Sequence, residues 1–71
     1  MSRYLVIIEE SATGFSAFLP DLPGCIATGT TRDEVENAMR AGVEYHLEDL
    51  RESGEPVPPP RSTATYVEVA A

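Results

Sequence analysis

The sequence predicts an α+β domain in which three strands, one helix and a final strand follow one another along 71 residues. Two observations carry this prediction. The proline-rich turn Pro20–Cys25 separates two short runs of strand composition, because proline has no N–H and pushes the residue before it out of the helical region. Shortly afterwards, Thr31 stands three residues before Glu34, which is the spacing of a capping box at a helix start. The expected architecture is β-β-β-α-β, with one four-stranded mixed sheet and a single helix on one face.

Three segments in the first half of the chain have the composition of strands, at about residues 3–9, 15–20 and 25–30. The first contains the apolar run Tyr4–Ile8, whose β-branched and aromatic side chains suit a strand that is buried on both faces. A polar stretch ending at Gly14 favours a hairpin connection to the second strand. Short connections between consecutive strands predict an antiparallel meander.

One amphipathic helix is expected over about residues 32–53, because apolar residues recur there at spacings of three and four. These positions are Val35, Ala38, Met39, Gly42, Val43, His46 and Leu50. Gly54 is a suitable residue directly past the helix end. Glu44, Glu48 and Glu52 repeat at every fourth position and predict an acidic ridge on the exposed side of the helix. This ridge is either solvated or available to a partner.

A proline-rich segment, residues 55–61, follows the helix and predicts a stiff, extended connector. It is either a spacer that returns the chain to the sheet or a ligand for an SH3-like module. Residues 62–69 are rich in Thr, Tyr and Val, which predicts a final strand. A right-handed crossover allows that strand to pair in parallel with a meander strand. With a single helix, the opposite face of the sheet, including Phe18, is uncovered, and an exposed apolar face predicts association.

Size and cysteine content predict self-association in a reducing compartment. A domain this small buries only ~60% of the surface of its unfolded chain and usually needs a disulfide, a metal or a second copy. Cys25 is the single cysteine, so an internal disulfide and a zinc cluster are not expected, and at least a dimer is. The chain has no cleavage signal after Met1 and no apolar run near the ~20 residues of a membrane helix. We therefore expect a cytoplasmic protein.

The formal net charge is −7, from twelve acidic residues against five arginines and no lysine. Binding to DNA or RNA draws mainly on Lys and Arg contacts to phosphate, so nucleic-acid binding is not expected. The acidity either supplies solubility only or favours a basic protein partner, since opposite charge speeds encounter.

Few residues are candidates for catalysis. Cys25 begins a strand and His46 lies on the helix stripe, so a reactive cysteine–histidine pair is not expected, and Cys25 suits the role of a small buried hydrophobe. His46 is interpreted as a core-edge residue bonded to a backbone carbonyl or Asp49, or as a group that titrates at an interface. Carboxylates such as Glu9 and Glu68 are not expected to converge on a metal. The sequence favours a non-enzyme without cofactor or metal.

Three motifs together resemble the family of HicB-type antitoxins. They are the turn Pro20–Cys25 preceded by Phe18, the segment Gly29–Thr31 leading into an acidic helix, and Leu47–Leu50 followed by the exit Gly54–Pro58. The similarity covers essentially the whole chain. It implies a partial ribonuclease-H-like fold without ribonuclease activity.

The resemblance also implies a function. Members of the family bind HicA, a small basic toxin that cleaves messenger RNA, and mask its active site, and they commonly assemble as dimers or larger homo-oligomers. Full-length members usually add a carboxy-terminal DNA-binding domain. The chain stops after its last predicted strand, so operator binding is not expected.

Two alternatives stay open beside the antitoxin reading. One is a stand-alone homo-oligomer with a regulatory role and no toxin partner, and the other is a cryptic nuclease or thiol enzyme. For the antitoxin reading, the residues expected at protein interfaces are Phe18, Asp21, Leu22, Pro23, Glu44, Glu48, Glu52 and His46.

Overall fold

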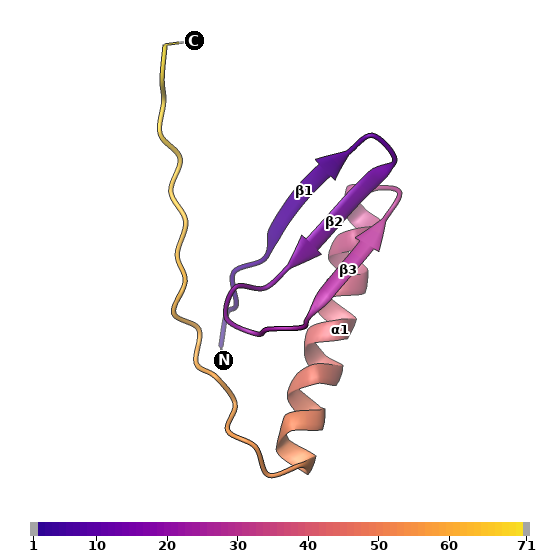
Figure 1. Ribbon diagram of the computed structural model, residues 1–71, viewed down its shortest axis with the longest axis vertical. Coiled ribbons are helices and arrows are strands. Elements are labelled where there is room, and N and C mark those ends of the chain that lie inside the picture. The colour runs from indigo at the N-terminus through magenta and orange to yellow at the C-terminus, as the bar shows by residue number, and fades with distance from the viewer. Residues whose placement is uncertain (1, 71) are drawn as a thin grey trace.

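The computed structural model describes residues 2–70 and shows a three-stranded antiparallel sheet with one long helix (Figure 1). The strands are β1 (Ile7–Ser11), β2 (Gly14–Phe18) and β3 (Ile26–Gly29), and the helix α1 spans Arg32–Glu52. The strand order in the sheet is β1-β2-β3, so the meander is confirmed. The helix covers one face and packs on β2 and β3. The α+β class and the order β-β-β-α are as the sequence predicted.

The core lies between α1 and the face of the sheet that contains Ala17. Ala17 pairs with Ile8 of β1 on one side and with Ala27 of β3 on the other, so these three side chains share a face. The side chains with almost no exposed surface are Ala17, Leu19, Leu22, Cys25, Val35 and Met39. Among residues 2–70, six residues form this buried cluster, which agrees with the small core expected for the chain length.

Reciprocal hydrogen bonds fix the start of α1 as the sequence predicted. The Glu34 backbone N–H donates to Thr31 Oγ1 over 3.1 Å, and the Thr31 backbone N–H donates to Glu34 Oε2 over 3.0 Å. The Thr30 hydroxyl and the Thr30 N–H also donate to that carboxylate, and these bonds, with the Thr31 N–H, lower the pKa of Glu34. At the other end, Gly54 adopts a left-handed φ of 72° that glycine tolerates best, and its N–H donates to the Arg51 carbonyl.

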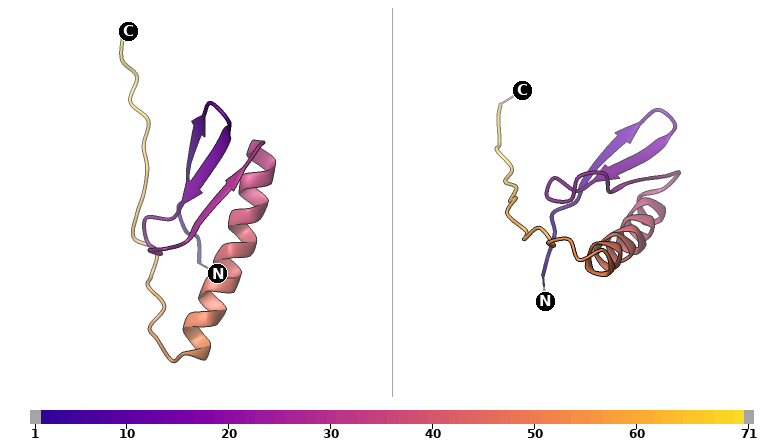
Figure 2. Two further views of the ribbon diagram at one scale, coloured as in Figure 1. Left: turned by 45° about the vertical axis from the view of Figure 1, so that its right-hand side comes forward. Right: turned by 60° about the horizontal axis from the view of Figure 1, so that its bottom comes forward.

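The predicted fourth strand is not formed within residues 2–70. Residues 55–70 run as one extended segment that has neither helix nor strand (Figure 1). The segment stands clear of the sheet, on the side away from α1 (Figure 2). The physical reason is the anchoring of residues 58–62, described below, which sends the chain away from the sheet before the Thr- and Val-rich residues begin. A strand also needs an adjacent backbone to pair with, and residues 63–70 have none in this chain.

We predict that Thr31→Ala lowers the free energy of unfolding by about 1 kcal/mol, because it removes the hydroxyl that accepts the Glu34 N–H. Urea unfolding followed by circular dichroism measures this change. The matched control is Thr13→Ala, which removes a hydroxyl from the exposed hairpin connection and should leave stability within about 0.5 kcal/mol of the wild type. Equal losses in both variants would contradict the capping role.

Candidate protein-interaction surfaces

A groove of about 980 Å³ runs between β1, with the segment before it, and the helix α1. It exists because α1 packs on β2 and β3 and leaves the β1 side of the sheet uncovered. Apolar side chains lining it are Tyr4, Val6, Ile8, Met39, Val43, Leu47 and Val57. We call this hollow the β1–α1 groove. Concave apolar surfaces with a few polar groups are typical of binding sites.

Three of the five arginines of the chain, Arg32, Arg40 and Arg51, line the β1–α1 groove. Arg32 Nε donates to Glu36 Oε1 over 3.0 Å, an exposed pair that contributes little stability. The sequence did not predict this grouping, because acidic residues outnumber arginines on the helix. The spacing could have revealed part of it, because Arg40 and Arg51 are eleven residues apart, about three helical turns.

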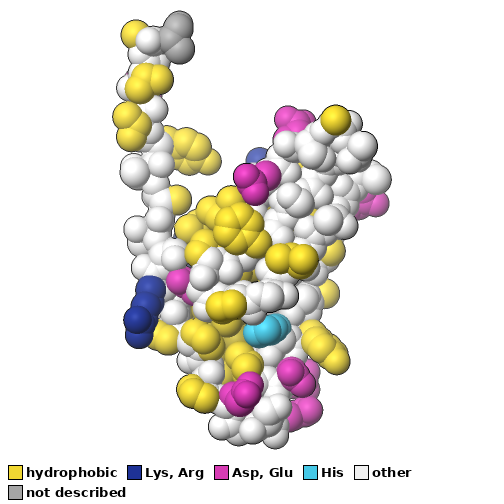
Figure 3. All heavy atoms as spheres, in the orientation of Figure 1, with side chains coloured by type: hydrophobic (Ala, Val, Ile, Leu, Met, Phe, Trp, Pro, Cys, Tyr) yellow, Lys and Arg dark blue, Asp and Glu magenta, His cyan; other side chains and the backbone are white. Residues whose placement is uncertain are grey.

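The face of the sheet opposite α1 carries an apolar row across all three strands. Ile7 of β1 pairs with Phe18 of β2, and Phe18 pairs with Ile26 of β3. Phe18 is 39% exposed and Ile26 is 76% exposed, and apolar side chains gather on this face in Figure 3. The prediction that Phe18 lies on an uncovered face is confirmed. We call Ile7, Phe18 and Ile26 the open-face row.

In the turn between β2 and β3, Leu22 is buried and Pro23 is exposed. The Leu22 N–H donates to the Leu19 carbonyl and the Cys25 N–H donates to the Leu22 carbonyl, which folds the turn so that the Leu22 side chain enters the core. Leu22 is 0% exposed, so the expectation that it is exposed is wrong. Pro23 is exposed, as expected.

Asp21, which is predicted to meet a partner protein, binds the C-terminal segment of its own chain, and its role in partner binding stays a prediction. Its Oδ2 accepts hydrogen bonds from the Arg61 N–H (2.8 Å) and the Ser62 N–H (2.9 Å), and its Oδ1 accepts one from the Ser62 hydroxyl (2.8 Å). The Ser62 N–H, followed by the Arg61 N–H, lowers the pKa of Asp21. We call this contact the Asp21 clasp. Its partners lie some forty residues away in sequence, so no local pattern indicates it.

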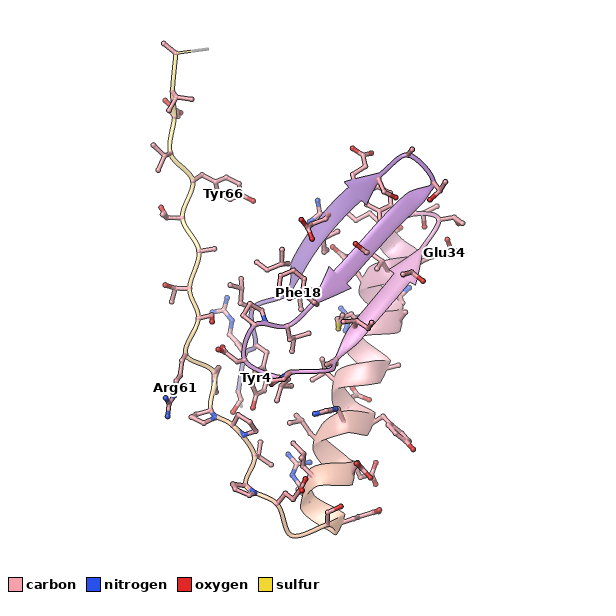
Figure 4. All side chains as sticks on the ribbon, in the orientation of Figure 1. Tyr4, Phe18, Glu34, Arg61 and Tyr66 are labelled. Atoms are coloured by element: carbon pink, nitrogen blue, oxygen red, sulfur yellow. The ribbon has the colours of Figure 1, made fainter. Side chains whose placement is uncertain are left out.

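A second contact holds the proline connector a little earlier. The Tyr4 hydroxyl donates to the Pro58 carbonyl over 2.6 Å. The labelled side chains in Figure 4 show Tyr4 beneath the sheet, near the point where the connector passes Arg61. With the Asp21 clasp, this bond ties the connector to both the N-terminal segment and the β2–β3 turn.

The remaining predicted interface residues lie on α1. Glu44, Glu48 and Glu52 are all exposed, so the acidic ridge exists as an exposed feature. His46 is half-buried, and its ring reaches the molecular surface (Figure 3). None of the side-chain hydrogen bonds within residues 2–70 involves His46, so the expected bond to Asp49 or to a carbonyl is not formed. The proposed role of these four residues in binding stays a prediction.

The candidates for chemistry are not brought together. Cys25 is 6% exposed with its Sγ 3.8 Å from Met39 Sδ, and burial raises the pKa of its thiol, which disfavours the reactive thiolate. Among residues 2–70, no three His, Cys, Asp or Glu side chains are grouped as metal ligands would be. In the same part of the chain, no helix is long and apolar enough to cross a bilayer.

Comparison with known proteins gives consistent matches. Residues 4–70 match the family model described as the HicB-like antitoxin of bacterial toxin–antitoxin systems. Antitoxin HicB 2 of Photorhabdus laumondii is 34% identical over 73 residues, which cover 97% of this chain and 50% of that protein. A UPF0150 protein of Thermoplasma acidophilum is 30% identical over 70 residues, covering 97% of this chain and 99% of that protein.

The structure is similar to a chain of a HicA3 and HicB3 toxin–antitoxin complex. The TM-score is 0.71 with 30% sequence identity, over 83% of this chain and 70% of that one. The chain spans about half the length of some curated relatives that it matches, the Photorhabdus antitoxin among them.

We predict that Leu22→Ala lowers the free energy of unfolding by about 2–5 kcal/mol, because it leaves a cavity in the small core. Urea unfolding at one fixed protein concentration measures this loss. Leu50→Ala is the matched control, since it deletes the same atoms from a half-buried position and should cost clearly less. A smaller loss for Leu22→Ala than for Leu50→Ala would contradict the assignment of Leu22 to the core.

We predict that Asp21→Asn speeds hydrogen exchange at the Arg61 and Ser62 amides several-fold near neutral pH, because the acceptor loses its charge. The pKa of Asp21 is lowered from 3.8 by the clasp, so the clasp is fully formed above that value and is lost as pH falls through the folded pKa. In the wild type, the Arg61 and Ser62 amides should therefore lose their protection from exchange, relative to other exposed amides, as the pH falls. In Asp21→Asn this pH-dependent loss should be absent. Asp49→Asn, a change at an exposed helix carboxylate, is the control. Unchanged exchange in Asp21→Asn would contradict the clasp.

Proposed function

The chain belongs to the family of HicB-like antitoxins of bacterial toxin–antitoxin systems, and from this we propose that it binds a small basic HicA-type toxin. The main support for this proposal is the structural similarity to a chain of a HicA3 and HicB3 complex, with a TM-score of 0.71 and 30% sequence identity. Binding places the antitoxin over the active site of the toxin and involves no catalytic step by this chain. The complex forms in the cytoplasm, where messenger RNA is the substrate of the toxin.

Charge supports a basic partner. The chain carries a formal charge of −7, and on α1 the exposed glutamates Glu44, Glu48 and Glu52 form a continuous negative ridge without a lysine among them. Opposite charges on two partners raise the rate of productive encounter more than they raise final affinity. The acidic ridge therefore guides the toxin toward the helix side of the domain.

The exposure of individual side chains indicates which residues are available to contact the toxin. Phe18 and Pro23 are exposed apolar groups, and His46 lies half-buried beside the acidic ridge, so these side chains are available to a partner. Leu22 contributes through the core, and Asp21 contributes by positioning the C-terminal segment. The comparisons do not favour the alternative of a stand-alone oligomer without a toxin.

We predict that Glu44→Lys with Glu48→Lys lowers the association rate with a HicA-type toxin about tenfold at low salt and changes the dissociation rate little. Stopped-flow mixing at two or more salt concentrations measures both rates. The matched control is Glu9→Lys with Glu10→Lys, which makes the same charge change at the end of β1. If both double variants slowed association equally, the net charge of the chain, and not the position of the acidic ridge, would determine the association rate.

Binding itself is tested by titrating the purified chain into a reaction in which a HicA-type toxin cleaves messenger RNA. We expect cleavage to stop at a fixed molar ratio that equals the stoichiometry of the isolated complex. A chain that neither binds the toxin nor protects the RNA would contradict the proposed function, whatever the charge variants do.

A further inference from the structure

Residues 63–70 have the chemistry of a strand but no strand beside them. The backbone of this segment is extended (Figure 1), and its sequence is rich in Thr, Val and Tyr, which are favoured in strands. Tyr66 is 100% exposed, Val67 77% and Val69 76%, which makes three of the six large hydrophobic side chains that are exposed in residues 2–70. A segment of this kind buries its side chains and backbone groups only by pairing with another strand.

The same chain presents an unpaired strand edge. β1 pairs with β2 on one side only, so its other edge carries free N–H and C=O groups. The opposite edge, on β3, has only four residues and is confined between the proline turn and the helix cap. The edge of β1 is therefore the better acceptor for an added strand.

We propose that residues 63–70 of one copy add a strand to the β1 edge of a second copy, so that two chains complete each other's sheets. A strand at this edge directs alternate side chains to the two faces of the sheet. We assign Tyr66 and Glu68 to the β1–α1 groove, and Val67 and Val69 to the open face. This inference concerns self-assembly and does not depend on toxin binding.

The groove matches the side chains assigned to it. Its floor is apolar and large enough for an aromatic ring such as that of Tyr66. Its lining carries three arginines, Arg32, Arg40 and Arg51, and two glutamates, Glu36 and Glu44, and Arg32 is paired with Glu36. Three positive and two negative charges leave a net charge of +1, and Glu68 is the single charged residue in the segment 63–70. On the other face, valines at positions 67 and 69 extend the open-face row by one strand, and apolar cross-strand neighbours stabilise such pairs.

The anchoring of the connector favours a second copy over pairing within one chain. The Tyr4–Pro58 bond and the Asp21 clasp hold residues 58–62 against the N-terminal segment and the turn, and the chain beyond them leaves the sheet. Figure 3 shows this segment separated from the body of the molecule, and Figure 4 shows Tyr66 projecting toward the side where Phe18 lies. Each chain offers one unpaired strand-forming segment and one acceptor edge on β1, so a two-fold exchange satisfies both in each copy.

Disulfide trapping between two distinguishable chains tests this arrangement. In a Cys25→Ala background, one chain carries Glu9→Cys, which lies on the open face of β1, and a longer, tagged chain carries Thr65→Cys or Thr63→Cys. We expect mild oxidation of the mixture to join the two kinds of chain through at least one tail position. Glu48→Cys on the exposed side of α1 replaces Glu9→Cys in the control and should give no such product.

The remaining outcomes of the trapping experiment contradict the proposal. Tail-to-tail disulfides alone would indicate a ribbon of two C-terminal segments. A chain carrying both Glu9→Cys and Thr65→Cys that closes on itself at high dilution would indicate pairing within one copy. The absence of any mixed product would also overturn the strand exchange.

Sedimentation equilibrium provides an independent test. The double variant Val67→Pro with Glu68→Pro removes two neighbouring N–H groups, of which one must point toward β1 in the added strand. We expect this proline variant to raise the dimer dissociation constant at least tenfold. The control variant, Val67→Thr with Glu68→Gln, keeps both N–H groups and should dimerise more tightly than the proline variant. The helical signal in circular dichroism should remain alike in all variants, because α1 lies outside the exchanged segment. A monomeric wild type, or a proline variant that dimerises like the wild type, would overturn the proposal.

Discussion

The β2–β3 turn is the constraint on which the rest of the structure depends. Its prolines limit the backbone, and two consecutive side chains then point in opposite directions. Leu22 fills the centre of the core, while Asp21 accepts three hydrogen bonds from residues 61 and 62. One rigid turn therefore joins the sheet, the core and the C-terminal segment. A change at either position acts on a different part of the molecule, although the two residues are neighbours in sequence.

The position of α1 explains why so much apolar surface stays uncovered. A single helix is about 10 Å wide and cannot cover a whole sheet, and here it lies over β2 and β3. β1 is left with a free edge, a groove on the helix side and the open-face row on the other side. In a chain of 71 residues these features amount to a large share of the surface, so the domain depends on partners for full burial.

Local signals explain which parts of the fold were predictable. The spacing of Thr31 and Glu34 and the helical periodicity identified α1, and proline and glycine positions identified the meander. The sequence could not reveal that Leu22 points inward, because a leucine between aspartate and proline looks the same in either orientation. It also could not reveal the Asp21 clasp, which joins residues some forty positions apart. The helical periodicity correctly predicted that Val35 and Met39 are buried, but it also included Ala38, which is exposed. Whether a side chain at the margin of the apolar face is buried depends on how far the sheet extends beneath the helix.

The fourth strand shows a different limit of sequence reasoning. Composition identified residues 62–69 as strand-forming, yet a strand is defined by its neighbour, and composition says nothing about which chain supplies that neighbour. The acidity of the chain bears on this choice, because two copies of charge −7 repel one another over most of their surfaces. Contact through a segment with a single charge, against a groove whose three arginines outnumber its two glutamates, avoids most of that repulsion. Glu48 and Glu52 of the acidic ridge lie outside the groove and stay exposed in each copy, whereas Glu44 lines the groove. Self-assembly through the groove therefore leaves most of the ridge available to a basic toxin.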